Sequence, residues 1–92
     1  MILTFADRDS ADLFAGKRVK RFANIASVAE RKFQQLDSAA TLNALRVPPG
    51  NRLEALVGER QGQHSIRIND QWRVCFVWTA AGVRDVEIVD YH

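Results

Sequence analysis

The chain is 92 residues long and 47% apolar, which suits one small domain with a packed core. No segment approaches the ~20 consecutive apolar residues of a membrane span, and nothing at the N-terminus is typical of a signal peptide. We therefore expect a single cytoplasmic domain over residues 1–92, without a membrane partner. The net charge is only +2, but ten of the 13 basic residues are arginine, which favours bidentate contacts with phosphate.

The first half of the chain predicts one short strand and two helices. Apolar residues at positions 2, 3 and 5 favour a strand, and Asp9 or Ser10 is suited to cap a helix that Gly16 ends. After a basic segment, apolar residues recur at helical spacing and predict the longest helix, with Asn24 or Ser27 as its cap. These apolar residues are Ile25, Val28, Ala29, Phe33 and Leu36.

The second half of the chain predicts strands. Residues 41–45 favour one more helical turn, and the prolines of segment 48–51 are expected to exclude regular structure there. The apolar period then changes to two, and turn signals at 58–62, 69–70 and 80–82 separate the strands. Strands that follow helices predict an α+β fold, in which an N-terminal strand and helices pack on a mainly antiparallel sheet of four or five strands.

The strand phase divides the side chains of this sheet between two faces, because residues two apart point the same way. The face expected to cover the helices carries Ile66, Ile68, Trp72, Val74, Phe76, Val86 and Ile88. The other face carries Ser65, Arg67, Arg73, Cys75, Val77, Glu87, Val89 and Tyr91. Arg67 and Arg73 flank a tight turn and should be cross-strand neighbours. Two cations held together favour either a bound anion or a structural ion pair with Glu87 or the terminal carboxylate.

The last strand ends on Asp90, Tyr91 and His92, three side chains that can move or orient protons. Cleavage of RNA by its own 2′-hydroxyl needs a base for that hydroxyl, cations for the charge that builds on the phosphate, and an acid for the leaving 5′-oxygen. His92 is the best proton-transfer group, and Asp90 is suited to orient it. Tyr91 is suited to stack on a base or to donate a hydrogen bond.

Three segments together resemble HigB-type toxins of the RelE/ParE superfamily, and the resemblance runs the length of the chain. They are residues 50–56, 63–76 and 86–92. The resemblance implies a compact toxin of a type II toxin–antitoxin pair, a metal-independent endoribonuclease without cofactors that cuts mRNA in the A site of the 70S ribosome. It also implies a HigA-type helix-turn-helix antitoxin as partner, through which alone the toxin would contact operator DNA.

The cations for this chemistry are expected on the strands, in the turn at 58–62 and in the basic segment. Arg73 is predicted to stabilise the transition-state charge, with Arg60 and Arg67 as further phosphate-binding residues. The basic segment would grip ribosomal RNA through phosphates, although such a cluster is usually a solvated surface. Its predicted contact residues are Lys17, Lys20 and Arg21.

One position departs from the family's pattern. HigB-type toxins often carry a lysine in the segment after Leu-Glu-Ala-Leu, where this chain has Val57, with Glu54 nearby. Each ~1.4 kcal/mol of lost transition-state stabilisation is a tenfold effect on the rate. We therefore expect a weaker nuclease than the family's strongest members.

Other interpretations of the same residues stay open. ParE-like proteins of the superfamily poison DNA gyrase without cutting RNA, and a non-catalytic module that holds its antitoxin and tunes operator repression is a further alternative. His92 is also interpretable as a frayed terminal residue, His64 as a structural histidine, and Trp72 and Trp78 as packing residues. Cys75 is the single cysteine, which excludes an internal disulfide and predicts a packed thiol.

Overall fold

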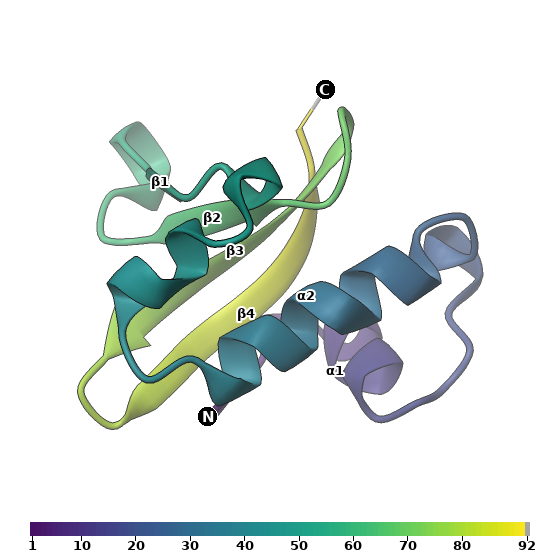
Figure 1. Cartoon of the computed structure of the whole chain (residues 1–92). Helices are drawn as coiled ribbons and strands as arrows, with labels where there is room; N and C mark the ends of the chain where they lie inside the picture. Colours follow the sequence, from purple (N-terminus) through teal and green to yellow (C-terminus); the bar gives the residue numbers. More distant parts are fainter. Residues whose placement is uncertain (92) are drawn as a thin grey trace.

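The computed structural model, which describes residues 1–91, has two helices on one face of a four-stranded antiparallel sheet (Figure 1). The helices are α1 (Arg8–Phe14) and α2 (Ala26–Ser38). The strands, in their order across the sheet, are β1 (Glu54–Ala55), β2 (His64–Arg67), β3 (Trp72–Thr79) and β4 (Gly82–Asp90). Short 3₁₀ turns are η1 (Lys20–Phe22), η2 (Leu42–Arg46), η3 (Pro49–Asn51) and η4 (Gly58–Arg60). The α+β prediction is confirmed.

The two helices lie where the apolar spacing predicted, but their predicted caps are wrong. α1 begins after Asp7 and α2 after Ile25, and neither of these residues makes a side-chain capping bond. Ser10 is instead fully buried, and its Oγ accepts a hydrogen bond of 3.0 Å from the backbone N–H of Ile88. Burial and tertiary bonding therefore override the local capping signal. Gly16 follows α1 in the left-handed conformation, with φ 87°, as a helix-ending glycine does.

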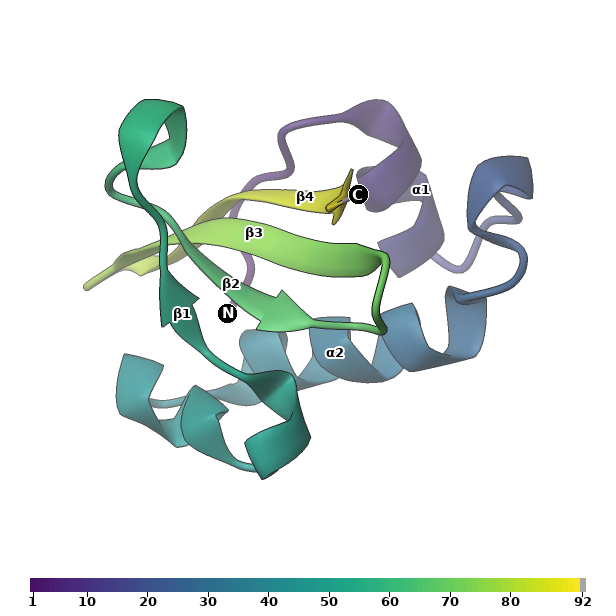
Figure 2. The ribbon, with the colours of Figure 1, turned by 90° about the horizontal axis from the view of Figure 1, so that it is seen from above.

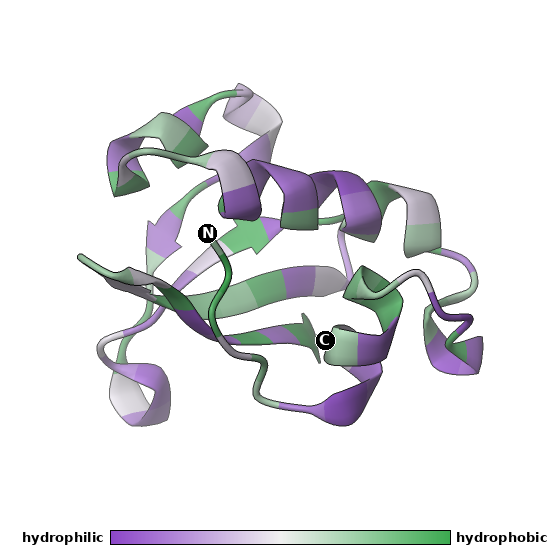
Figure 3. Cartoon of the chain, turned by 90° about the horizontal axis from the view of Figure 1, so that it is seen from below, coloured by the Kyte–Doolittle hydropathy of each residue, from purple (hydrophilic) through white to green (hydrophobic). Residues whose placement is uncertain are grey.

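The core lies between the helices and the sheet. Phe33 and Leu36 of α2 are fully buried, and the predicted inner-face residues of the strands are buried with them, except Trp72, which is partly buried against the core. The ring of Phe33 packs edge-on against Phe5 and Phe14, with centroids 5.7 and 5.8 Å away. Hydrophilic and hydrophobic bands alternate along α2, as one-sided burial requires (Figure 3). Within residues 1–91, no helix has the length and apolar character needed to cross a bilayer.

The predicted N-terminal strand pairs with β4 through two isolated parallel bridges, Ile2 with Val83 and Phe5 with Val86. It therefore extends the antiparallel sheet at its β4 edge without forming a continuous strand. A bulge in β4 accompanies this pairing, since Cys75 faces Glu87 whereas Val77 faces Arg84.

Asp85 lies in this bulge with φ 54°, and its backbone N–H donates to Thr4 Oγ1 at 2.9 Å. The bulge shifts the strand phase, so that Val83 and Val86, three residues apart, are both fully buried.

The segment between α2 and β1 lies beside the β1 edge of the sheet (Figure 1). Its helical turn at η2 is confirmed, and Thr41 Oγ1 accepts the capping bond from Ala44 N at 3.2 Å. The expectation of no regular structure at 48–51 is wrong for residues 49–51, because Pro49 begins the 3₁₀ turn η3.

Asn51, the last residue of η3, is fully buried. Its Nδ2 donates to Leu45 O at 3.0 Å and to Gln35 Oε1 at 2.8 Å, and its Oδ1 accepts from Lys32 Nζ at 2.6 Å. Burial, together with the nearby Arg31 and Arg67, lowers the pKa of Lys32. Asn51 thus fastens the loop before β1 onto α2.

Candidate active site on the outer face of the sheet

The face of the sheet away from α1 and α2, here called the outer face, carries a row of three residues across neighbouring strands. Ser65 of β2 pairs with Cys75 of β3, which in turn pairs with Glu87 of β4. Ser65 and Cys75 are fully buried although they point away from the main core. Other side chains of the outer face must therefore cover them, and these include the predicted site residues Arg73 and Tyr91.

Arg67 and Arg73 are cross-strand neighbours, as predicted. Their register is fixed by the β2–β3 turn, in which Asn69 Oδ1 accepts from the backbone N–H groups of Gln71 and Trp72, both at 2.8 Å. Arg67 forms an ion pair with Asp70 of the same turn. A structural ion pair therefore reduces the repulsion between Arg67 and Arg73, although its carboxylate belongs to Asp70 and not to Glu87.

Arg73 is held at two points of its guanidinium group. Nε donates to Ser65 Oγ at 2.8 Å, and Nη2 donates to the backbone carbonyl of Arg52 at 2.7 Å. Its Cζ lies 5.8 Å from the centroid of the Tyr91 ring. Within residues 1–91, Arg73 forms no ion pair. Both acceptors are neutral, so the positive charge of this guanidinium is oriented without being neutralised.

Arg60 approaches the outer face from η4. Its Nη1 donates to Gln63 Oε1 at 3.0 Å and lies 3.3 Å from Glu87 Oε1. This ion pair holds Arg60 against the row formed by Cys75 and Glu87. Any phosphate that binds Arg60 has to compete with the Glu87 carboxylate.

Tyr91 lies between Arg60 and Arg73. Its backbone N–H donates to Gln71 O at 2.6 Å, and 40% of the residue is exposed. Burial raises the pKa of Tyr91, as does its hydrogen-bonding contact with the Cys75 thiol, although Arg60 and Arg73 lower it. The phenol therefore stays protonated at neutral pH, where it can donate a hydrogen bond but does not serve as a base.

Burial is also the main cause that raises the pKa of the Cys75 thiol. A protonated and fully buried thiol is a poor nucleophile. The prediction of a packed cysteine is confirmed.

Two hollows open on either side of Tyr91. One, of about 380 Å³, is lined by Arg52, Arg67, Asn69, Asp70, Arg73 and Tyr91. The other, of about 470 Å³, is lined by Glu54, Ala55, Leu56, Val57, Glu59, Arg60 and Tyr91. The first is rich in arginine, whereas the second combines two carboxylates with the side chain of Val57, which is 84% exposed. A cation at position 57 would thus project beside Tyr91.

The predicted proton-transfer residues are only partly described. Asp90 pairs with Trp72, and its Oδ2 accepts from Gln71 Nε2 at 3.0 Å. It is in phase with Ile88 of the core, so it points to the opposite side from Tyr91. The structure therefore does not bring Asp90 onto the outer face with Arg73. His92 lies outside the described residues.

The predicted basic contact residues lie in and beside η1, between α1 and α2, at the opposite end of the molecule from β1 (Figure 2). Lys17 pairs with Asp12 at 3.7 Å, and Arg21 pairs with Asp9 at 2.7 Å and with Asp7 at 3.0 Å. Lys20 is exposed and forms no ion pair with the part of the chain that the structure describes. This segment is thus separate from the outer-face site, and acidic neighbours compensate two of its three predicted contacts.

The remaining aromatic residues of the prediction pack rather than line the site. Trp72 meets the buried Phe22 edge-on, with ring centroids 5.6 Å apart, and Trp78 packs against the core. The His64 ring stacks on Phe76, its partner across β2 and β3, at 6.3 Å. These contacts agree with the structural interpretation of all three residues.

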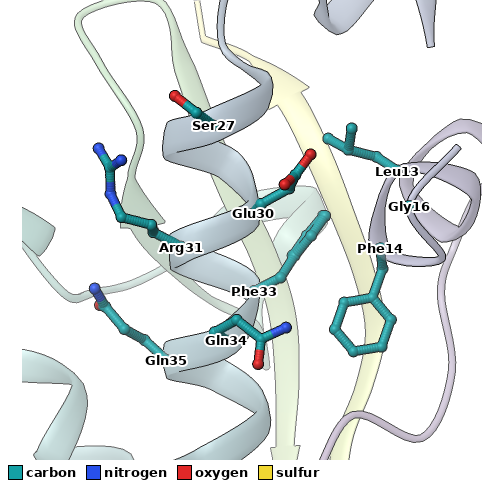
Figure 4. Close-up of a pocket in the computed structure, with 9 residues that line it drawn as sticks. All are labelled: Leu13, Phe14, Gly16, Ser27, Glu30, Arg31, Phe33, Gln34 and Gln35. Atoms are coloured by element: carbon teal, nitrogen blue, oxygen red, sulfur yellow. The ribbon is translucent and has the colours of Figure 1, made fainter. Parts of the chain in front are cut away.

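A further hollow, of about 630 Å³, separates α1 from α2 (Figure 4). Leu13, Phe14 and Phe33 give it an apolar floor, and Glu30, Arg31 and two glutamines line its α2 side. None of the predicted site residues that the structure describes lines this groove.

Two residues of the outer-face site were missed by the sequence analysis. Ser65 was assigned to the correct face but given no role, although it anchors Arg73. Arg52 was not considered, and it both anchors Arg73 and lines the arginine-rich hollow. The strand phase carried a signal for Ser65, whereas nothing local marks Arg52 as a residue with φ 47°.

The fold has a counterpart among solved structures. The structure titled "YoeB-YefM complex from Staphylococcus aureus" superposes with a TM-score of 0.62 at 14% sequence identity, over 100% of this chain and 98% of that one. At this identity the likeness establishes the fold alone. The chain therefore shares the α+β architecture of that structure.

Sequence comparisons identify the family. The model of the family described as "RelE-like toxin of type II toxin-antitoxin system HigB" matches residues 4–92. Toxin HigB-1 of Vibrio cholerae serotype O1 is 38% identical over 80 residues, which are 85% of this chain and 84% of that protein. An uncharacterized protein of Haemophilus influenzae is 35% identical over 54 residues, 59% of this chain and 54% of that protein.

Fold and sequence together define a toxin of the type II toxin–antitoxin class. Within this class, the chain belongs to the HigB family of RelE-like toxins. The resemblance seen in three segments of the sequence is thereby confirmed.

Proposed function

We propose that this HigB-family toxin is an endoribonuclease that cuts mRNA in the ribosomal A site through attack by the 2′-hydroxyl group, without a metal ion or cofactor. The observation that carries the proposal is the state of Arg73. Its guanidinium is fixed by Ser65 and by the Arg52 carbonyl, faces a hollow beside Tyr91, and forms no ion pair within residues 1–91. A fixed and uncompensated guanidinium suits a transition state in which negative charge builds on phosphate.

The reaction divides its roles among the residues of this site. The 2′-hydroxyl loses its proton and its oxygen bonds to phosphorus, while the bond from phosphorus to the 5′-oxygen breaks and that oxygen gains a proton. A 2′,3′-cyclic phosphate and a 5′-hydroxyl result. Arg73 stabilises the charge on the phosphate, and the protonated Tyr91 donates a hydrogen bond or stacks on a base.

His92 is the proposed proton-transfer residue. Since Asp90 points away from Tyr91 and is held by Gln71, its proposed role is to order the end of the chain and to bias His92 toward its charged form. Arg60 and Arg67 act as secondary phosphate contacts, because each already pairs with a carboxylate.

The proposed partner is a HigA-type helix-turn-helix antitoxin, and operator DNA would be bound only through it. Family membership supports this assignment, and the structural neighbour was itself solved as a complex. On the ribosome, Lys17, Lys20 and Arg21 are the proposed contacts to ribosomal RNA. Lys20, which is exposed, is the residue most available for phosphate.

The test is cleavage of a defined mRNA on 70S ribosomes, with new 5′ ends mapped by primer extension. Wild type should produce ends at A-site codons, His92→Ala and Arg73→Ala should not, and free mRNA should stay intact. A single 2′-deoxy nucleotide at the cleavage position should abolish the new end, because the nucleophile is then missing. The proposal would be refuted if ribosome-bound mRNA stayed intact at high toxin concentration. Inhibition of DNA gyrase by the same preparation would favour the ParE-like alternative.

A further inference from the structure

Arg52, whose carbonyl bonds Arg73, is held in an unusual backbone conformation. It follows η3 with φ 47° and ψ 55°, a region that residues with a Cβ adopt rarely. The preceding residue, Asn51, is fully buried and bonded to Leu45 and Lys32. The carbonyl of Arg52 in turn accepts the 2.7 Å bond from Arg73 Nη2. The loop is thus fixed on one side by α2 and on the other by the guanidinium of the site.

A second arginine without an ion pair within residues 1–91 thus lines the same hollow as Arg73. Arg52, Arg67 and Arg73 line the same hollow of about 380 Å³, together with Tyr91. Arg67 is paired with Asp70, but neither Arg52 nor Arg73 forms an ion pair within residues 1–91. Like charges on one hollow repel each other unless an anion joins them, so the hollow is electrostatically suited to a polyanion.

We propose that Arg52 is an additional RNA-binding residue, which holds a backbone phosphate next to the phosphate that Arg73 contacts. Arg52 accepts the hydrogen bond from Arg73 with its backbone carbonyl and not with its side chain. The guanidinium of Arg52 therefore remains available for bidentate binding of a phosphate in the hollow that this residue lines. Tyr91, which lines the same hollow, offers a ring on which the intervening base can stack. The ligand is single-stranded RNA over two consecutive phosphates, and the inference rests on the proposed function.

The first measurement is binding of a short single-stranded RNA with 2′-O-methyl riboses, which the proposed reaction does not cleave. Fluorescence anisotropy would compare wild type with Arg52→Asn across a series of salt concentrations. Asparagine tolerates the left-handed conformation, so this variant removes the charge while it preserves the loop. Arg8→Gln is the matched control, because this substitution also removes one positive charge, and Arg8 lies on α1 with its side chain 89% exposed.

We expect Arg52→Asn to bind about tenfold more weakly, and the slope of log affinity against log salt to fall in magnitude by about 0.7, as for one lost phosphate contact on a single strand. Arg8→Gln should stay near wild type. Equal affinity and slope for wild type and Arg52→Asn would overturn the inference, as would equal losses in both variants or no binding by wild type.

Cleavage of ribosome-bound mRNA by wild type separates this inference from the proposed function. If RNA binding depends on Arg52 while wild type leaves ribosome-bound mRNA intact, the phosphate site stands and the nuclease proposal fails. If wild type cleaves and Arg52→Asn binds normally, the nuclease stands and the role of Arg52 is wrong.

Discussion

Removal of the Ser65 hydroxyl tests whether Arg73 acts through its fixed orientation. Ser65 is fully buried, and its Oγ accepts from Arg73 Nε at 2.8 Å. The substitution Ser65→Ala deletes this one acceptor and leaves the second anchor, the Arg52 carbonyl, in place. Alanine removes a single oxygen from a site that is already enclosed, so the fold should survive.

The expected cost follows from the bond that is lost. Hydrogen bonds to charged groups contribute about 1.5–3 kcal/mol, and the loosened guanidinium recovers part of this from water and from Arg52. A net loss of about 1.4 kcal/mol in the transition state lowers kcat about tenfold. Because substrate is also bound by other cations, KM should change less than kcat.

A double-mutant cycle supplies the decisive assay. The second variant of the cycle is Arg73→Lys, because lysine lacks the guanidinium Nε that donates to Ser65. In the Arg73→Lys background, Ser65→Ala should therefore have little further effect on the rate. The rate constants would be measured on programmed ribosomes for wild type, both single variants and the pair, with thermal unfolding as a check on folding. An equal loss from Ser65→Ala in both backgrounds would refute the positioning role, since the effect would then not pass through Arg73.

Three further predictions concern other parts of the molecule. Val57→Lys places a cation beside Tyr91 and should raise the cleavage rate about tenfold for each 1.4 kcal/mol it contributes; an unchanged rate on programmed ribosomes would refute the prediction that Val57 weakens the proposed nuclease. Gly82→Ala should destabilise the fold by about 3 kcal/mol, or roughly 15 °C in Tm, because Gly82 has φ 150° and an added Cβ would lie 2.7 Å from the Met1 carbonyl oxygen. An unshifted melting curve would contradict this. Burial raises the pKa of Cys75 above its ordinary 9.0, so folding keeps this thiol protonated and the free energy of unfolding should fall as pH rises above that value. Urea unfolding would measure this free energy at intervals from pH 8 to about 10, and the free energy should fall less with pH for Cys75→Ala than for wild type. The fall that remains in Cys75→Ala at higher pH is due to Tyr91, whose pKa is also raised. Identical pH dependences of wild type and Cys75→Ala would contradict the assignment to Cys75.

Much of the fold was predictable because it depends on local periodicity. The helical spacing of Ala29, Phe33 and Leu36 placed α2, and the alternation along β3 assigned Val74 and Phe76 to the core face. Caps were less predictable, because a residue such as Ser10 is used by a strand 78 positions away instead of by its own helix. The bulge at Asp85 was also hidden, since it depends on the hydrogen bond from Asp85 N to Thr4.

The candidate site divides in the same way. The sequence by itself determined the family, the outer face and the pairing of Arg67 with Arg73, because motif, strand phase and turn length are all local properties. Only the tertiary structure decided which of the three arginines predicted on this face lacks a carboxylate partner within residues 1–91. Arg60 and Arg67 are matched to carboxylates, whereas Arg73 is held by a buried hydroxyl and by a carbonyl of residue 52. That carbonyl lies 21 positions away along the chain, and its placement depends on the buried contacts of Asn51 with α2. Charge alone therefore indicated where phosphate chemistry is expected, and packing at a distance selected the residue that is oriented for it.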